Sequence, residues 1–231
     1  MPFDLRRLDE IEEHGDEFYE YKNELLDLFA DSPEGKACLQ ENESAIFWAG
    51  SVIEYGFSYV GSPLHEMNAD EMEELLTEIF PRKISLSKPD DADNGLPGMI
   101  AFWEYLKREY QLSNADNILR YLRAVKPADF KKWMNDSSRF GMAKSFFSMA
   151  QSEGFDLSNE EDNRAFMALY NARLQSGSFA GFPLPSHDLS LLGGGFPFDL
   201  KPVEKSKKER DKARHKRKIA RASRKKNRKR K

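Results

Sequence analysis

The chain has 231 residues and a net charge of −3, and 39% of its residues are hydrophobic. That apolar content is enough to bury a core, so the chain is not a wholly disordered one. Its one cysteine, Cys38, excludes an internal disulfide framework and fits a reducing compartment. No apolar run approaches the ~18 residues that span a bilayer, and the acidic N-terminus resembles neither a secretory signal nor a transit peptide. We therefore expect a soluble cytoplasmic protein that does not insert into membranes, with the nucleus as an alternative location if the source is eukaryotic.

The small net charge conceals two opposed parts of the chain. Residues Lys201–Lys231 hold 18 Lys and Arg against three acids, a charge of about +15. Residues Met1–Leu200 hold 18 bases and 36 acids, a charge of about −18. A strongly basic segment predicts a polyanionic partner, whereas the acidic part should avoid phosphate.

Apolar residues recur at three- and four-residue intervals through residues 1–175, with almost no alternating runs. This pattern predicts an all-α domain, a bundle of about seven or eight helices. Core packing is the default interpretation of its aromatic pairs. They are Phe18-Tyr19, Phe47-Trp48, Phe102-Trp103 and Phe146-Phe147.

The first half of this domain carries several helix boundary signals. Asp4–Phe29 is predicted to be helical, with Gly15 as a break. Ser32 and Pro33 predict the start of a helix that continues, with a kink, through Phe57.

Further boundary signals follow along the chain. Asn68 and Glu71 form a capping box before a helix that Pro81 should end. Arg82–Asn94 is polar and is the longest predicted loop of the domain. Beyond it, further helices are predicted from Leu96 to Gln175. Their signals are N-caps at Ser113 with Asp116 and at Ser158 with Glu161, a start at Pro127 and an end at Gly154.

Residues 176–200 are rich in Gly, Pro and Ser and contain no Lys or Arg, which predicts a flexible linker. A Gly-Phe-Pro unit followed by an apolar residue occurs twice within it. Phe182, Phe196 and Phe198 are therefore candidate partner-docking residues. The alternative is that these rings pin the linker onto the helical domain.

The basic tail, residues 201–231, is predicted to be disordered or transiently helical when free, because its like charges repel one another. Lys and Arg side chains neutralise phosphate and release condensed counterions, so the predicted partner is RNA, ribosomal RNA included, or DNA. The candidate nucleic-acid-binding residues are Lys207, Lys208, Arg210, Lys212, Arg214, Lys216, Arg217, Lys218, Arg221, Arg224, Lys225, Lys226, Arg228, Lys229, Arg230 and Lys231. The tail has no aromatic stacking platform, which argues against base specificity. Rival uses of the charge are a nuclear import signal, an anionic membrane, and a clasp onto the acidic domain.

No motif in the chain carries a recognisable reaction. The four His are scattered and none has a partner at metal-ligand spacing. The acidic run Asp90–Gly95 fails as a calcium loop, because Ala92 and Ala101 occupy positions that need oxygen ligands. Cys38 is interpreted as a small core residue. The sequence therefore predicts no catalytic residue, metal ligand or cofactor.

These observations lead to one hypothesis and two alternatives. The chain is interpreted as a non-enzymatic accessory protein of nucleic acid, whose tail binds phosphate without strong sequence specificity and whose acidic body contacts an unknown protein partner. The first alternative is a protein–protein adaptor in which the helical body and the Gly-Phe-Pro repeats bind partners and the tail is secondary or autoinhibitory. The second is an enzyme with a pocket inside the bundle.

Overall fold

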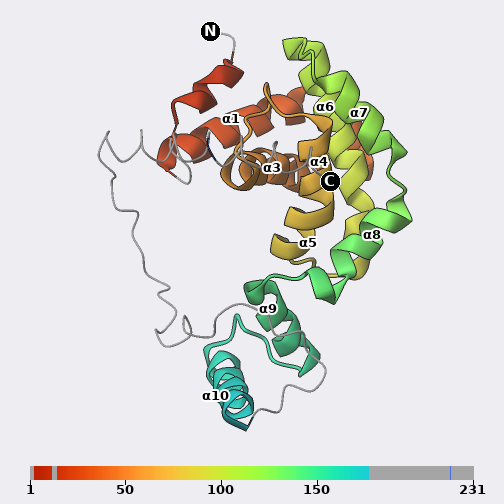
Figure 1. Cartoon of the computed structure of the whole chain (residues 1–231). Helices are drawn as coiled ribbons and strands as arrows, with labels where there is room; N and C mark the ends of the chain where they lie inside the picture. The colour runs from red at the N-terminus through yellow and green to blue at the C-terminus, as the bar shows by residue number, and fades with distance from the viewer. Residues whose placement is uncertain (1–2, 12–14, 177–218, 220–231) are drawn as a thin grey trace.

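A computed structural model describes residues 3–11, 15–176 and 219 of the chain (Figure 1). These residues lie in helices and loops, with no strand among them, which confirms the predicted all-α class. Within this part of the chain, no helix has both the length and the apolar character needed to cross a membrane.

The helices follow one another through short connections. The α-helices are α1 (Asp16–Asp31), α2 (Pro33–Glu41), α3 (Ala45–Tyr55), α4 (Ala69–Glu74), α5 (Phe80–Lys83), α6 (Gly95–Tyr110), α7 (Ala115–Ala124), α8 (Pro127–Asn135), α9 (Met142–Ser152) and α10 (Glu160–Ser176). The 3₁₀ segments are η1 (Leu5–Asp9), η4 (Pro89–Asn94) and η5 (Ser137–Arg139), and the π segments are η2 (Gly56–Val60) and η3 (Leu75–Ile79). Because η3 joins α4 to α5, the ten α-helices of the described residues form nine continuous helices, rather than seven or eight.

Part of the difference arises after α2, where one kinked helix was predicted through Phe57. The chain instead leaves the helix at Asn42, whose φ of −143° and ψ of 90° are extended. The Asn42 side chain accepts a hydrogen bond from the Ser44 backbone at 3.0 Å and donates one to the Asn94 carbonyl at 2.8 Å. An Asn that bonds both its own turn and a distant carbonyl favours a break over a continued helix.

The N-terminal caps predicted in the first half of the body are confirmed. The Ser32 hydroxyl accepts a hydrogen bond from the Gly35 backbone at 3.0 Å, and Pro33 takes the first position of α2. Asn68 and Glu71 form the reciprocal bonds of a capping box at the start of α4. Each cap satisfies backbone N–H groups that the first helical turn leaves without partners.

Two later caps were placed one residue too early. α10 starts after Asn159, whose side-chain oxygen accepts hydrogen bonds from the Glu161 and Asp162 backbone at 2.8 and 3.4 Å, rather than after Ser158. Likewise α7 starts after Asn114, not Ser113. In both places an Asn follows the Ser. Asn159 caps its helix as well as a Ser would, whereas the Asn114 side chain forms no cap hydrogen bond and bonds the Leu64 and Met67 carbonyls instead.

The prediction that Pro81 ends its helix was wrong, because the helix continues to Lys83. Proline has no N–H, so the Thr77 carbonyl loses its usual donor from four residues later. Arg139 supplies a substitute, and its Nη1 donates to the Thr77 carbonyl at 2.6 Å. The π segment η3 directly before the proline also changes the backbone hydrogen-bond pattern, since the Phe80 N–H donates to the Leu75 carbonyl five residues earlier.

The large hydrophobic core is centred on α6, which packs against α2, α3 and α7. Trp48 and Trp103 are almost fully buried in it. The Trp48 ring contacts those of Phe80 and Phe130, with centroids 6.0 and 5.5 Å apart, so α3, α5 and α8 meet at one side chain. A buried indole that joins three helices makes this core continuous.

Several residues of the aromatic pairs were wrongly assigned to the core. Phe47 and Phe147 are 50% and 48% exposed, and Tyr19 is 40% exposed. Neighbouring residues on a helix point about 100° apart, so a helix with one face on the core exposes one member of such a pair. Phe102 and Trp103 are both buried, because α6 lies at the centre of the core. The exposed members are therefore available for contacts outside the core.

A second, small hydrophobic cluster joins α9 to α10. Met149, Ala150 and Phe166 are its buried residues, and Phe146 and Tyr170 pack against it. The Phe146 ring lies 4.9 Å from that of Phe166 and 5.2 Å from that of Tyr170. Figure 1 shows this α9–α10 hairpin set apart from the other helices, beyond the end of α8.

Gly61 ends the helix formed by α3 and η2 in a left-handed conformation, with φ of 74°. The backbone N–H groups of Gly61 and Ser62 both donate to the Gly56 carbonyl, as in glycine-terminated helices. Because a Cβ strains this conformation, we expect Gly61→Ala to lower the free energy of unfolding by about 1 kcal/mol. Urea unfolding will measure it. Gly61→Asn is the control and should lose less, since Asn tolerates this region; equal losses for both variants would contradict the conformational cause.

Candidate functional site: a groove between the helical body and the α9–α10 hairpin

The functional residues predicted from sequence lie outside the described part of the chain. The phosphate-binding candidates fall within Lys207–Lys231, and the candidate docking residues are Phe182, Phe196 and Phe198. Their roles therefore stay predictions. The described residues contain a different candidate site, where α9 meets the rest of the body.

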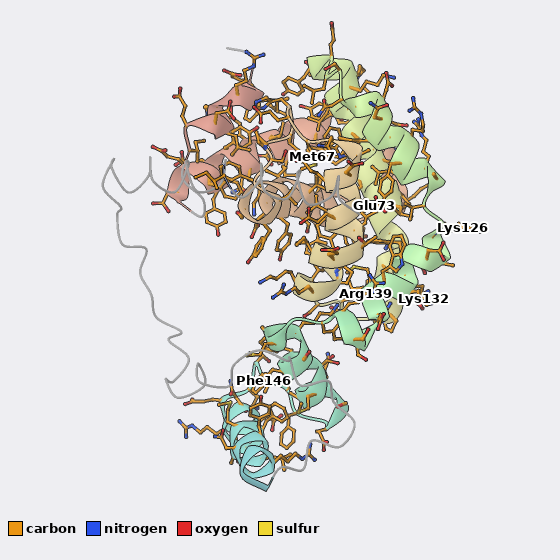
Figure 2. All side chains as sticks on the ribbon, viewed as in Figure 1. Met67, Glu73, Lys126, Lys132, Arg139 and Phe146 are labelled. Atoms are coloured by element: carbon orange, nitrogen blue, oxygen red, sulfur yellow. The ribbon has the colours of Figure 1, made fainter. Side chains whose placement is uncertain are left out.

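The chain enters α9 through a tight contact with the end of α5. The Gly141 backbone N–H donates to the Arg82 carbonyl at 3.0 Å. A Cβ on Gly141 would lie 2.8 Å from that same oxygen, closer than real Cβ contacts. Figure 2 shows Arg139 at this end of the body, where it reaches the Thr77 carbonyl. Residues 139–141 therefore fix α9 against α5.

Lys144, one turn into α9, is the most unusual charged side chain of the described residues. It is only 7% exposed. Its Nζ donates to the Pro81 carbonyl at 3.0 Å and to the Met134 carbonyl at 2.9 Å, and it lies 3.9 Å from the centroid of the Phe140 ring. The ammonium group thus meets carbonyls near the C-terminal ends of α5 and α8, where helix dipoles favour positive charge.

Burial opposes this favourable placement. Removal from water lowers the pKa of Lys144 to about 8, because desolvation penalises the charged form of an amine. The amine therefore still carries its charge at neutral pH, held by two carbonyls and an aromatic face. Such a lysine is a structural link between three helices and also the inner wall of a groove.

The groove lies between the loop after α5, the end of α8 and the α9–α10 hairpin, and its volume is about 890 Å³. Lys144, Phe147, Ser148 and Gln151 line it from one face of α9, as their three- and four-residue spacing requires. The opposite face of α9, with Met149 and Ala150, packs in the small core. The remaining lining residues are Ser85, Leu86, Ser87, Pro89, Met134, Asn135, Phe140 and residues 154–158.

The acidic groups near this groove take part in ion pairs or hydrogen bonds. Asp136 bonds Arg139 at 3.2 Å, Glu153 bonds Arg173 at 2.8 Å, and Asp90 bonds Lys131 at 2.7 Å. Asp156, the one acid in the described lining, accepts hydrogen bonds from the Ser158 backbone and hydroxyl, and the pKa of its carboxyl is lowered by them. Asp136, Glu153 and Asp90 are thus balanced by bases, whereas Asp156 accepts hydrogen bonds but forms no salt bridge among the described residues.

Two basic residues beside the groove form no salt bridge among the described residues, although the charge of Lys88 helps to lower the pKa of the nearby Asp90 carboxyl. Lys88 lies between the lining residues Ser87 and Pro89, and Lys132 lies one turn before Asn135 on α8. Both side chains are exposed, and Figure 2 labels Lys132 at the end of the body that meets α9. The rim of the groove therefore carries two lysines that form no salt bridge in the described part of the chain.

This local charge is opposite to that of the N-terminal part of the body. Residues 1–79 hold 21 acids and four bases, whereas residues 80–144 hold 12 bases and eight acids. Within 120–144 the bases number seven and the acids two. The acidic character assigned to the whole body thus belongs mainly to its first 79 residues.

The acidic run after Lys88 forms the 3₁₀ segment η4, part of the predicted loop 82–94. Lys131 binds both Asp90 and Asp93, and the Asp91 carboxylate accepts a hydrogen bond from the Lys88 backbone at 2.8 Å. The Lys131 ammonium holds the pKa of Asp90 below its usual value. Across the described residues, no group of three or more His, Cys, Asp and Glu is placed to hold a metal ion.

A second hollow, of about 520 Å³, lies between α4 and α7. Asn68, Asn114, Asn117 and Arg120 give it a polar lining. The amide of Asn114 donates to the Leu64 and Met67 carbonyls at 2.9 and 2.6 Å, so this side chain fixes the loop before α4. Its observed contacts are structural ones.

Cys38 is half-buried and packs against the large core, in agreement with its interpretation as a core residue. Burial raises the pKa of its thiol. A raised pKa keeps the sulfur in the poorly nucleophilic thiol form at neutral pH.

The groove could not be recognised from sequence, but one signal pointed to it. Phe146 and Phe147 point about 100° apart on a helix, and Lys144 shares the face of Phe147 by its three-residue spacing. The carbonyls that hold Lys144 belong to Pro81 and Met134, which carry no sequence pattern for this role.

Comparison of the chain with protein-family models, with curated proteins and with solved structures found no match. A functional conclusion therefore has to come from the residues of this chain alone.

Proposed function

We propose that this protein is a non-enzymatic accessory protein of nucleic acid. Its basic tail, residues 201–231, binds the phosphate backbone of RNA, ribosomal RNA included, or of DNA, without strong sequence specificity. The observation that carries the proposal is the density of charge, 18 Lys and Arg among the last 31 residues. Each phosphate neutralised by such a side chain releases condensed counterions, which favours binding.

The helical body supplies the contact with protein in this proposal. Residues 1–79, with 21 acids against four bases, repel phosphate at close range. If residues 1–79 face away from the nucleic acid, their surface can bind a protein partner. The proposed location is the cytoplasm, or the nucleus in a eukaryotic source, which the single free cysteine fits.

Binding of structured RNA and of duplex DNA across a salt series tests the proposal, with fluorescence anisotropy as the readout. If six phosphates are engaged, log K should fall against log salt with a slope of about −5. A full-length variant with the sixteen candidate cations changed to glutamine should lose binding, and a chain ending at Leu200 should behave alike. Tighter binding of the structured RNA than of the duplex DNA would identify RNA as the preferred partner of the tail.

Binding that persists in the glutamine variant would contradict the role of the tail. Absence of binding by the unmodified chain at low salt would contradict the proposed function altogether. The glutamine variant keeps the full length of the chain, so it separates loss of charge from loss of the segment.

One observation favours the adaptor as a second candidate. The groove beside α9 presents Leu86, Phe147 and Phe155 together with uncharged polar groups, a lining also suited to a protein segment. In that role the Gly-Phe-Pro residues Phe182 and Phe196 add contacts with the partner. Recovery of one defined partner by the chain ending at Leu200 and by the full-length chain alike would support the adaptor over the nucleic-acid role.

A further inference from the structure

We propose that the groove beside α9 binds one unpaired nucleotide of the nucleic acid that the tail holds. The inference rests on the proposed function and deepens it, since it adds a contact with a base to a tail that contacts phosphate. It assigns to the body the aromatic platform that the tail lacks.

An exposed aromatic ring lines the groove. Phe147 is 48% exposed. It lies on the face of α9 opposite to the one that packs in the small hydrophobic cluster. Phe140 and Phe155 are half-buried and also line the groove. Every base has a π face, so aromatic rings at the edge of a cavity bind bases of any sequence by stacking.

The groove also contains side-chain groups that can form further hydrogen bonds. Gln151 and Ser148 are exposed and lie on the same face of α9 as Phe147. On α8, the Asn135 amide nitrogen donates to the Pro89 and Lys131 carbonyls at 3.3 and 2.9 Å. Its side-chain oxygen accepts no hydrogen bond from the described residues. An amide oxygen, a second amide and a hydroxyl can pair with the edge of an unstacked base.

The rim of the groove carries two exposed lysines. Lys88 and Lys132 flank the lining residues and form no salt bridge in the described part of the chain, whereas Asp136, Glu153 and Asp90 are each paired with a base. The lining itself contains one acid, Asp156, whose carboxylate accepts hydrogen bonds from Ser158. A phosphate on either side of a bound nucleotide would meet the two lysine ammonium groups.

The same charge decides between a nucleotide and a peptide. An apolar peptide would use Phe147 and Phe155 but leave both lysines without a partner. A nucleotide uses the rings, the amides and the lysines together, so the local charge favours it.

The test compares two exposed phenylalanines of the full-length chain. Phe147→Ala should weaken binding of a single strand of about 12 nucleotides by about 10-fold, within the range for loss of one stacked base. Its affinity for a duplex should stay the same, because paired bases are not free to stack. Phe47→Ala is the matched control, since Phe47 on α3 is 50% exposed and lies outside the groove lining. It should leave both affinities unchanged.

A charge variant tests the phosphate-binding role of the two rim lysines. Lys88→Glu with Lys132→Glu should flatten the salt dependence of single-strand binding by about 0.7 for each phosphate that the groove no longer binds. Lys36→Glu with Lys107→Glu is the charge-matched control on α2 and α6; both residues are exposed and pair with aspartates. The control variant should change the slope of log K against log salt less than Lys88→Glu with Lys132→Glu does.

The outcomes separate this inference from the proposed function. If the glutamine variant of the tail fails to bind but Phe147→Ala binds like Phe47→Ala, the tail role stands and the nucleotide site is wrong. That result would leave the groove to a protein segment. If the unmodified chain binds no nucleic acid, both proposals fall.

Discussion

Gly35→Ala is expected to lower the free energy of unfolding by about 3 kcal/mol, because a Cβ there collides with backbone. An ideal Cβ on Gly35 lies 1.9 Å from the Phe29 carbonyl oxygen and 2.7 Å from the Phe29 carbonyl carbon. The Ser32 hydroxyl bonds the same oxygen at 2.6 Å and accepts the Gly35 N–H, so the collision also disturbs the cap of α2. Thermal unfolding followed by circular dichroism should show a melting temperature about 6–12 °C lower.

Gly50→Ala is the matched control for this prediction. Gly50 is also a buried helical glycine, but its added Cβ would lie 3.3 Å from Leu26 Cδ1, the end of a flexible side chain. Alanine is preferred to glycine inside a helix by about 1 kcal/mol, which offsets the small adjustment. Gly50→Ala should therefore melt within a few degrees of the unmodified protein. Equal melting temperatures for the two variants would show that α1 and α2 separate easily and that Gly35 is not needed.

Lys144→Met is expected to remove a rise in stability between pH 8 and pH 10. The folded state lowers the pKa of Lys144 to about 8, below the ordinary value of about 10.5. Between these values the unfolded chain binds the proton and the folded chain does not, so the free energy of unfolding rises with pH. In this pH range, the free energy of unfolding of the unmodified protein should rise relative to that of Lys144→Met by about 1 kcal/mol for each pH unit. It is absent below pH 8, where both states carry the charge.

Urea unfolding at several pH values will measure this difference. Methionine retains most of the length of the side chain, so the variant changes the charge and the two hydrogen bonds with little change in volume. Tyrosines such as Tyr105, whose pKa is raised by burial, affect stability at high pH in both proteins alike and cancel in the comparison. Parallel stability curves would mean that Lys144 titrates as an exposed lysine does.

The helix class and several boundaries could be predicted from sequence because they are local. Ser32 with Pro33, Asn68 with Glu71, and Gly154 act within one turn of the residues they cap, so neighbouring residues determine them. Pro81 was misjudged because its effect depends in part on Arg139, which is 58 positions away. A local rule has no information on a donor that arrives from elsewhere in the fold.

The groove was not predictable for the same reason. Lys144 is held by carbonyls of Pro81 and Met134, and every residue offers the same carbonyl in a sequence. The charge of the tail, in contrast, depends only on composition and needs no fold to be recognised. Phosphate binding by the tail can therefore be proposed from the sequence alone, whereas the nucleotide site can be proposed only from the structure.

The small core of the α9–α10 hairpin has a consequence for the native ensemble. Among the described residues, the cluster of the hairpin buries Met149, Ala150 and Phe166, whereas the large core contains many more buried residues. Regions with few buried contacts open by sub-global unfolding at free energies well below that of the whole molecule. The amides of α10 should therefore exchange with deuterium sooner than those of α6. A ligand that binds α8 and α9 in the closed form would slow this exchange, and the opening equilibrium would in turn lower the apparent affinity for that ligand.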